Sequence, residues 1–520
     1  MLSKCFCFAK TLGGYFLQQS HQESVIKEGT NFPGKTYAEV VLEPAYIQAK
    51  NELLSPMMAV NKAHLIMLAE QGLIPGEEGL RIAAAIQTLD LDRLRRSAYT
   101  GQFEDLFFEV EHELLALAGD AAGNLHLARS RNDMGIAIYR IVLREKLLNA
   151  IRSALLLHRS LRAFAWRHRE TVMVAHTHTQ QAQPTTLAHY IAAVSDSLER
   201  DIRRLRTAFA GCNRSSLGAA ALATSGFAVS RERAAELLAF DGLVENSYDA
   251  VSGADYAGEA AAAVQLAAVN LGRFIQDLLL WCTQEFAVLR VADPYVQVSS
   301  IMPQKRNPVS IEHMRSLLSA CAGDAGTVLS MIHNTPFGDI VDTEDDMQPY
   351  AWKSAASLEA VYRLLTRVIE SLDVNADVLL ERARRSFAPV TELADTLVRA
   401  ERLSFRTAHA IVSRAVSELT AQGASVDRLT LGLVNEAAAG IIGRPLQLKE
   451  SELRLALDPI HFVRIRSVRG GPAPAEIGRA LQEQERRLED LQQWAERKTG
   501  SIERSLSGLD ETLAGWTANS

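Results

Sequence analysis

Helix-breaking residues are scarce in the middle of this sequence. Between Pro75 and Pro294 there is a single proline, Pro184, in a region rich in Ala, Leu, Arg and Glu. Because proline breaks helices and those other residues favour them, long helices should dominate this region. Strand-like alternation of apolar and polar residues is equally scarce. The chain has 520 residues, too many for one small core, so we predict several helical units in an all-α fold. We expect a long central helix bundle at 127–385, flanked by smaller helical domains at 1–126 and 386–520.

Three further absences exclude classes of function. No uninterrupted apolar stretch is long enough to cross a bilayer, so we expect no membrane span. The net charge of -7 argues against nucleic-acid and anionic-membrane partners, which need a basic surface, although it allows a local cationic pocket for a small anion. The cysteines are five, scattered and odd in number, which indicates reduced thiols and no disulfide framework. We therefore expect a cytoplasmic protein.

The chain opens with an apolar stretch, MLSKCFCFAKTLGGYFL, that Lys10 and Gly13-Gly14 interrupt. No clear small-residue cleavage site follows it. We interpret this N-terminus as a mobile extension, with a secretion signal as the alternative.

Two long helices can be placed from the spacing of apolar residues. Between Tyr256 and Phe286, apolar residues recur at steps of three and four, which puts them on one stripe of a helix. About thirty helical residues would span roughly 45 Å. A second helix is predicted over 309–332, with Pro308 at its first position. After Phe387 the chain is again helical, and its last amphipathic stretch should be mostly solvated. The apolar stripe of the helix predicted between Tyr256 and Phe286 consists of Val264, Ala267, Leu271, Phe274, Leu278 and Cys282.

Polar clusters interrupt this helical background, and the first is HLARSRND at 126–133. It could be no more than a helix start, in which a serine, asparagine or aspartate caps a helix that begins near Met134. In a functional interpretation, the cluster places donors around a carboxylate, a task that suits guanidinium geometry. These donors are Arg129, Ser130, Arg131 and Asn132.

The second cluster is HTHTQQAQP at 176–184, where His176 and His178 alternate. Such a pair raises the question of a metal site. No third ligand of suitable spacing and no Cys-x-x-Cys accompany it, so we predict no metal. Histidines of this kind are more often ordinary surface or core groups than catalysts.

The third cluster, at 216–240, can be explained as a small-residue turn that leads into an amphipathic helix capped by Ser230. Arg231 is its candidate for binding. The fourth, VSSIMPQKRNP at 298–308, is harder to explain as a linker, because a linker needs no such mixture of serines, cations and asparagine. It ends at a helix N-terminus, where backbone N–H groups and the helix dipole favour anions.

Taken together, these motifs resemble a known family. SSIMPQKRNP resembles the signature loop of the fumarase/aspartase superfamily, whose members eliminate fumarate from succinyl compounds. HLARSRNDM, HTHTQQAQP, NSYDAVSGADY at 246–256 and SFRTAHAIVSRAV at 404–416 resemble the argininosuccinate lyases, in that family's order. The resemblance begins at about Tyr46. It implies a cofactor-free all-α homotetramer acting on a small dicarboxylate, with each active site assembled from three subunits.

The resemblance also implies roles for the residues. Ser299 would be the base that takes a proton beside a carboxylate, with its alkoxide stabilised by loop N–H groups, the helix dipole and Lys305. Lys305 and Asn307 would hold the dianionic intermediate. His178, partnered by Glu312, would act as the acid at the leaving nitrogen. The substrate-binding residues would be Arg129, Ser130, Asn132, Thr177, Arg231, Ser300 and Asp105.

The chain departs from the family pattern mainly where the amine half of the substrate should bind. Carboxylates added there, and a lysine lost, favour a leaving group with more positive charge. The departures are Asp339, Glu344 and Met347 for the usual tyrosine, glutamine and lysine, Phe107 for histidine, Val298 for glycine and His176 for tyrosine.

We therefore predict a carbon–nitrogen lyase that releases fumarate from argininosuccinate, or from another succinylated amine or diamine. A non-catalytic paralogue with the same fold is the alternative from another class. It is disfavoured because a scaffold has no physical need for the intact set around Ser299 and His178. A metal-dependent hydrolase built on His176 and His178 is a more distant alternative.

Overall fold

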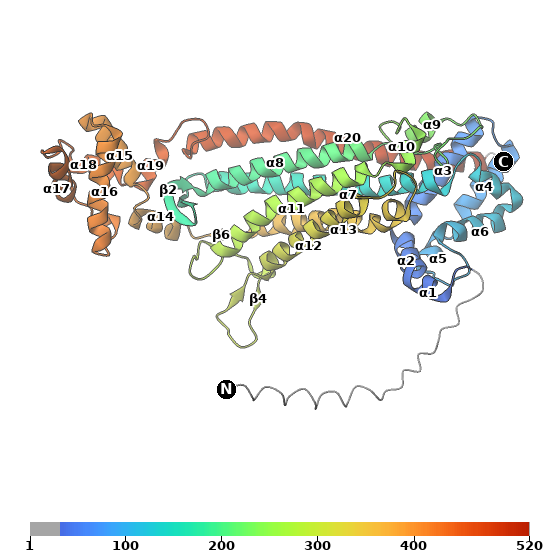
Figure 1. The fold of residues 1–520 in the computed structure, drawn as a ribbon, viewed down its shortest axis with the longest axis horizontal. Helices are drawn as coiled ribbons and strands as arrows, with labels where there is room; N and C mark the ends of the chain where they lie inside the picture. Colours follow the sequence, from blue (N-terminus) through green and yellow to red (C-terminus); the bar gives the residue numbers. More distant parts are fainter. Residues whose placement is uncertain (1–31, 519–520) are drawn as a thin grey trace, which may run out of the picture.

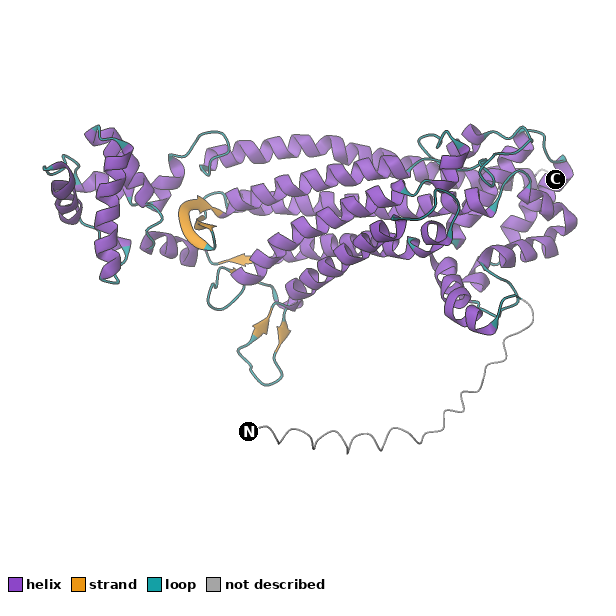
Figure 2. Cartoon of the chain, in the orientation of Figure 1, coloured by secondary structure: helices purple, strands orange, loops and turns teal. Residues whose placement is uncertain are grey.

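The structure is a computed structural model that describes residues 32–518. Most of the predicted N-terminal extension, with Cys5 and Cys7, therefore lies outside the described residues. Helices dominate the described chain and strands are few and short, which confirms the predicted all-α fold (Figure 2). Among the described residues, no helix is long and apolar enough to cross a membrane.

Long helices lie side by side and form the body of the molecule (Figure 1). Their apolar stripes share one hydrophobic core, in which Leu157, Leu205 and Leu365 are fully buried. These helices are α7 (Arg131–Arg167), α8 (Leu187–Cys212), α11 (Asp255–Trp281), α12 (Val309–Ile332), α13 (Gln348–Ser371) and α20 (Pro474–Ala518).

The N-terminal helices pack against one end of this bundle. Their apolar residues, such as Leu65 and Ile82, belong to the same core as the bundle, so the predicted boundary at residue 126 does not separate two cores. The elements are α1 (Lys35–Tyr37), the π-helical turn η1 (Ala38–Leu42), α2 (Glu43–Glu52), α3 (Leu54–Glu70), α4 (Gly76–Thr88), α5 (Leu91–Arg96), α6 (Leu106–Ala118) and the 3-10 segment η2 (Gly119–His126).

The opposite end carries a smaller group of helices with its own core, to which Leu397, Ile411 and Leu453 belong. These elements are α14 (Ala376–Arg385), α15 (Val390–Glu401), α16 (Phe405–Ala421), the 3-10 turn η5 (Val426–Arg428), α17 (Leu431–Ile442), α18 (Glu450–Ala456) and α19 (Pro459–Arg464).

The last helix departs from the predicted division of the chain. The sequence analysis places 474–518 in the C-terminal domain, but α20 runs back along the bundle and contacts α7 and α8 (Figure 1). The physical reason is its apolar stripe, which includes Ile477, Leu491 and Leu513 and is buried in the main core. The helix is therefore less solvated than its charged composition suggests.

The predicted ends of two helices can be compared with the observed ends. The helix predicted over 309–332 is α12, although Pro308 is its N-cap and not its first residue. The helix predicted up to Phe286 ends at Trp281, because the chain turns at Thr283 and reaches a positive φ of 48° at Ala287.

Three small antiparallel pairs complete the fold. Strands β1 (Val172–Thr177) and β2 (Gln180–Thr186) form a hairpin with a bulge between Val174 and His176. The pairs β3 (Leu289–Arg290) with β6 (Asp373–Val374) and β4 (Gln297–Val298) with β5 (Arg306–Asn307) are only two residues long. The remaining elements are α9 (Arg231–Leu237), α10 (Ser247–Ser252), the 3-10 turn η3 (Asp293–Tyr295) and the π-helical segment η4 (Asp342–Asp346).

Candidate active site

The predicted site residues lie in three separate places on the chain. The first group surrounds the start of α7, the second lies in the loop between β4 and β5 and the first turn of α12, and the third is the tip of the β1–β2 hairpin (Figure 1). Helix α7 has 37 residues, so about 55 Å of helix separates its start from the hairpin that follows its end. Within residues 32–518, no hydrogen bond or ion pair joins one group to another.

In the first group, Ser130 is the N-cap of α7. Its hydroxyl accepts the N–H of Asn132, and its own N–H donates to Asp133 Oδ1 at 2.8 Å, which makes a capping box. The helix therefore begins at Arg131, three residues before the predicted start. The Asn132 side chain donates to Asp339, so this predicted binding residue already faces an acidic partner.

Asp105 is engaged twice. It caps α6 by accepting the N–H of Phe108 at 3.0 Å, and its other oxygen lies 2.8 Å from the Arg131 guanidinium. That guanidinium also lies over the Phe108 ring, with 4.8 Å to the centroid. Asp105 thus fixes the approach of α6 to the start of α7.

Arg129 points into the interior between the N-terminal helices. Its Nε donates to His126 Nδ1 at 3.4 Å, while its buried Nη1 has no partner among the described residues. Burial lowers the pKa of this guanidinium to about 10. Arg129 is therefore not beside Asn132 in a common open cradle, as the sequence suggested.

Arg231 sits at the first turn of α9, after the predicted Ser230 cap. Its guanidinium donates to three backbone carbonyls, those of Leu217, Val244 and Glu245, at 2.9–3.0 Å. These hydrogen bonds tie the Arg231 guanidinium to the 217–245 loop. The geometry therefore supports a role in positioning this loop more than direct binding of substrate.

Two residues that the sequence analysis did not place in the site tie this loop to the start of α7. Asp133 is fully buried, and its carboxylate accepts the N–H of Gly218 at 2.8 Å. Gly218 has a φ of +80°, and a Cβ at that position would lie 2.6 Å from Arg231 Cγ. The small residues of 216–223 were the feature of the sequence that could have indicated this close packing.

The second group lies in an open loop. Ser299 Oγ accepts the N–H of Met302 at 3.1 Å and that of Ile301 at 3.4 Å. The side chains around it are exposed, with Ile301 at 83%. Ser300 and Lys305 are exposed as well, and Asn307 is half-buried in β5.

The loop is anchored at its base. Arg306 donates to the carbonyl of Val291 at 3.0 Å and forms an ion pair with Asp293 at 2.6 Å. Glu312 lies in the first turn of α12, directly after the loop. Within the described chain, Ser299 contacts neither a histidine nor a carboxylate.

The third group stands at a hairpin tip. His178 and Thr179 both have left-handed backbone conformations, with φ of 51° and 62°, and Thr177 precedes them at the end of β1. His178 and His176 are both exposed, and His176 also lines a cavity of about 270 Å³ under the hairpin together with Trp281. No cluster of three or more histidine, cysteine or acidic side chains suited to a metal ion occurs in residues 32–518.

The segment with the altered amine-recognition residues packs against the start of α7. Asp339 accepts from Asn132, and Glu344 Oε1 lies 3.2 Å from the position that a Cβ on Gly135 would take. Met347 is fully buried and does not face the site. Asp345, which sequence reasoning missed, accepts the Tyr139 hydroxyl at 2.6 Å.

Comparison with known proteins places these features in context. Residues 98–323 match the family described as "Lyase", and residues 387–464 match "Argininosuccinate lyase C-terminal". The chain is 38% identical over 492 residues to argininosuccinate lyase 2 of Agrobacterium fabrum, covering 94% of this chain and 97% of that protein. It is 34% identical to argininosuccinate lyase 1 of Shouchella clausii, with the same coverage.

A solved structure is similar over nearly the same extent. A variant of EDDS lyase with bound fumarate superimposes with a TM-score of 0.84 at 29% sequence identity, covering 92% of this chain and 93% of that one. The predicted resemblance is confirmed by these similarities. The individual site residues remain predictions.

Proposed function

The chain belongs to the argininosuccinate lyase family of the fumarase/aspartase superfamily and is a carbon–nitrogen lyase, and from this premise we propose that it eliminates fumarate from N-substituted aspartates. Argininosuccinate, which would give arginine and fumarate, is the first candidate because the similar proteins carry that name. A succinylated amine or diamine is the second candidate, and the carboxylates of Asp339 and Glu344 beside α7 favour it.

One observation carries the proposal for the base. Ser299 Oγ receives two backbone N–H groups from its own loop, at 3.1 and 3.4 Å. A free serine is far too weakly acidic to be a base at neutral pH. Donors directed at its oxygen stabilise the alkoxide over the neutral hydroxyl, which is the change that a serine base requires.

The other residues then have definite tasks. Ser299 removes the proton from the carbon beside one carboxylate, and the electron pair moves into that carboxylate to form a dianionic intermediate. Lys305 and Asn307 hold this charge. The carbon–nitrogen bond then breaks, fumarate forms, and His178, assisted by Glu312, gives the leaving nitrogen its proton.

A single chain cannot bring these residues together in the arrangement described, since the loop, the hairpin tip and the start of α7 lie apart. We propose that the protein is a homotetramer in which each site takes one group from each of three subunits. This arrangement would place Ser299 of one subunit beside His178 of another and Asn132 of a third. The proposal explains why His178 is exposed and Ser299 is only half-buried in a single chain.

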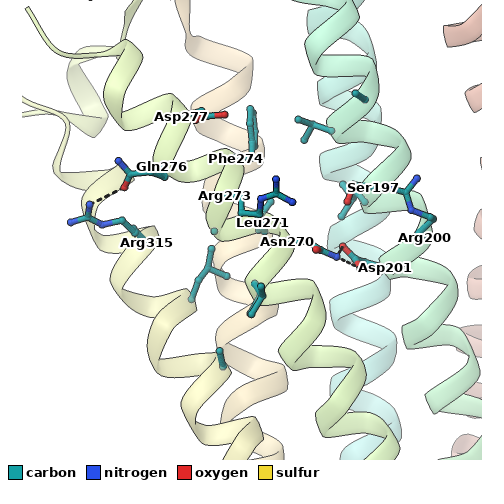
Figure 3. A pocket seen from close by; sticks show the side chains of 18 of the residues that line it. Ser197, Arg200, Asp201, Asn270, Leu271, Arg273, Phe274, Gln276, Asp277 and Arg315 are labelled. Carbon is teal, nitrogen blue, oxygen red and sulfur yellow. Dashed lines mark hydrogen bonds between the residues drawn. The ribbon is translucent and has the colours of Figure 1, made fainter. Parts of the chain in front are cut away.

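The side of the bundle offers a surface for that assembly. A groove of about 880 Å³ runs between α8, α11 and α12, and Figure 3 shows Leu271 and Phe274 in it. Polar pairs line the same groove, with Asn270 donating to Asp201 and Arg315 donating to Gln276, each at 3.0 Å. Exposed apolar residues continue along α11 and α12: Leu266, Val269, Leu280, Leu317 and Leu329. Burial against other copies of the chain would remove this apolar surface from water.

We also propose a cytoplasmic location. Cys212, Cys282 and Cys321 are free thiols in the structure, in keeping with the reducing environment expected from the sequence.

The direct test is release of fumarate by the full-length protein from argininosuccinate and from a panel of succinylated amines and diamines. Fumarate is expected from at least one of them, with and without a chelator. A folded protein that releases none from the whole panel would support the non-catalytic alternative, and loss of activity in chelator would support the metal-dependent one.

A further inference from the structure

A cavity of about 270 Å³ lies under the β1–β2 hairpin. Its walls are the hairpin, the end of α11 with the turn that follows it, and α14, which lies beside the hairpin at one end of the bundle (Figure 1). Within the described chain, none of the residues proposed for catalysis or substrate binding lines this cavity. It is therefore a candidate binding site separate from the one proposed above.

Hydrogen bonds hold two of these walls together. Asn375, which precedes α14, donates its N–H to the Val288 carbonyl at 2.9 Å and its Nδ2 to the Ala287 carbonyl at 2.6 Å. Further along α14, the Arg382 guanidinium donates to the Glu285 carbonyl at 3.0 Å. The turn after α11 is thus fixed to α14 by the fold itself, so these two walls of the cavity are formed before any ligand binds.

The lining changes from buried apolar side chains to exposed polar ones. Trp281 and Leu379 are buried, and Phe286 is half-buried beside them. His176 and Gln181 are exposed, and they form a cross-strand pair in the hairpin. Apolar walls with a few polar groups are the usual composition of a small-molecule site.

One cation and one anion line the cavity without a charged partner. Arg382 is half-buried, and its guanidinium lies 5.8 Å from the centroid of the Phe286 ring, whereas Glu285 is exposed. Among residues 32–518, neither side chain forms an ion pair, although Arg382 donates to the Glu285 backbone. A ligand that carries both charges would pair with both side chains through charge-assisted hydrogen bonds.

The volume of the cavity limits the size of that ligand. An apolar cavity of about 150 Å³ holds a benzene molecule. With about 270 Å³, the cavity under the hairpin has room for an aromatic ring joined to a small charged group at each side. The rings of Trp281 and Phe286 provide the surface against which an apolar or aromatic group packs favourably.

We infer that this cavity binds a free α-amino acid with an apolar or aromatic side chain. Its carboxylate pairs with Arg382, its ammonium group pairs with Glu285, and its side chain packs against Trp281 and Phe286. No bond of the ligand is made or broken. The inference does not depend on the proposed function, because binding can be measured without turnover.

Isothermal titration calorimetry of the full-length protein tests this inference with L-phenylalanine as the probe. Two analogues each lack one charge: phenylpropionate has no ammonium group, and phenylethylamine has no carboxylate. We expect saturable binding of L-phenylalanine, and binding of each analogue weaker by about tenfold or more, because each leaves one charged side chain unpaired. Excess fumarate should leave the affinity for L-phenylalanine unchanged, since the cavity is separate from the candidate active site.

Two charge variants locate the ligand. Arg382→Met should weaken binding of L-phenylalanine by about tenfold or more. Glu285→Gln should bring the affinities for L-phenylalanine and phenylpropionate to within about threefold of each other, because the ammonium group loses its partner. Arg384→Met, at an exposed position of α14 outside the lining, is the matched control and should bind L-phenylalanine as the wild type does. Melting temperatures establish that each variant is folded.

The possible outcomes separate this site from the active site. The inference is overturned if L-phenylalanine does not bind, if either analogue binds equally well, or if the folded Arg382→Met and Glu285→Gln proteins keep wild-type affinity. Displacement of L-phenylalanine by fumarate would also overturn it, because the ligand would then occupy the active site. A protein that binds L-phenylalanine as expected but releases no fumarate from any substrate retains this site and contradicts the proposed function alone.

Discussion

Ser299, the proposed base, is a weak acid whose side-chain oxygen accepts hydrogen bonds from its own loop. Its oxygen receives N–H groups from the two residues at positions 301 and 302, while the serine side chain remains outside the core. The proposed catalytic role of this residue is therefore separable from folding. A substitution here should affect the reaction and leave the free energy of unfolding nearly unchanged.

Ser299→Ala should reduce kcat for fumarate release by roughly a hundred- to ten-thousand-fold, the range for loss of a general base. Melting temperature and subunit assembly should match the wild type. Gln304→Ala, exposed in the same loop, is the control and should retain activity. Near-normal turnover by assembled Ser299→Ala protein would mean that another group is the base.

Glu344 leads to a prediction about stability and pH. Its pKa in the folded protein is about 9, raised from 4.5 mainly by burial and then by Asp345 and Asp339, with Arg131 opposing. The folded state therefore holds a proton that the unfolded state releases, so this residue's contribution to stability declines as pH rises from about 4.5 towards about 9.

Glu344→Gln should consequently raise the melting temperature more at about pH 8 than at about pH 5. Thermal unfolding at one scan rate, in matched buffers, measures the difference. Asp342→Asn removes an acidic charge from the exposed side of the same segment and should show no such contrast. An equal shift at both pH values would argue against a protonated Glu344.

At the scale of elements, the spacing of apolar residues predicts the helices that bury an apolar stripe in the core. Helix α12 was predicted from 309 to 332 and is observed with those bounds, because its stripe is buried and a proline precedes it. The β1–β2 hairpin was missed, although Val172 and Val174 are β-branched, because the strand segments are short and alternation breaks at the bulge after Val174.

The loop at 217–245 is an element whose shape the sequence could not reveal. It depends on long-range bonds, in which Gly218 donates to Asp133 and Arg231 donates to three carbonyls. Nothing in the local pattern distinguishes Arg231 as a positioning residue from a substrate-binding one. Only the fold, which brings these segments to the start of α7, separates the two roles.

Gly218→Ala should destabilise this loop by about 1–3 kcal/mol, because a side chain at its φ of +80° is strained and would meet Arg231 Cγ. Fumarate release should fall with it, as the loop supports the start of α7. Gly226→Ala is the matched control, since its Cβ would lie in open space and its φ is not positive. Chemical denaturation of both variants compares the two, and an equally small effect would contradict the assigned role.

At the scale of the whole molecule, the sequence could nominate candidate residues but could not predict how they are arranged in space. Motifs around Ser130, His178 and Ser299 could be found because each concentrates polar residues in a helical background. Their separation along the 37 residues of α7 could not be read from the motifs, because it follows from the length and packing of the bundle. Asp133 was considered only as a possible helix cap, and Asp345 was missed, because their partners Gly218 and Tyr139 lie far away in sequence.

The proposed sharing of sites between subunits can be tested by mixing two inactive proteins. Tetramers form at random from equal amounts of the Ser299→Ala and His178→Asn proteins. A site is intact when its serine comes from a His178→Asn subunit and its histidine comes from a Ser299→Ala subunit. Random assembly makes this true for about a quarter of sites, so about a quarter of wild-type activity should return after subunit exchange. If each site were built within one chain, every site would carry one defect and no activity would return.

A second mixture makes the interpretation specific. Ser299→Ala and Lys305→Met alter the same β4–β5 loop, so any site that takes this loop from one chain receives one of the two defects. This pair should regain no activity, even though its subunits exchange as freely as those of the first pair. Native mass spectrometry establishes the exchange in both mixtures. If activity returned in the second mixture, Lys305 would act in a different site from Ser299. If subunits exchanged in the first mixture but no activity returned, Ser299 and His178 of one chain would belong to the same site.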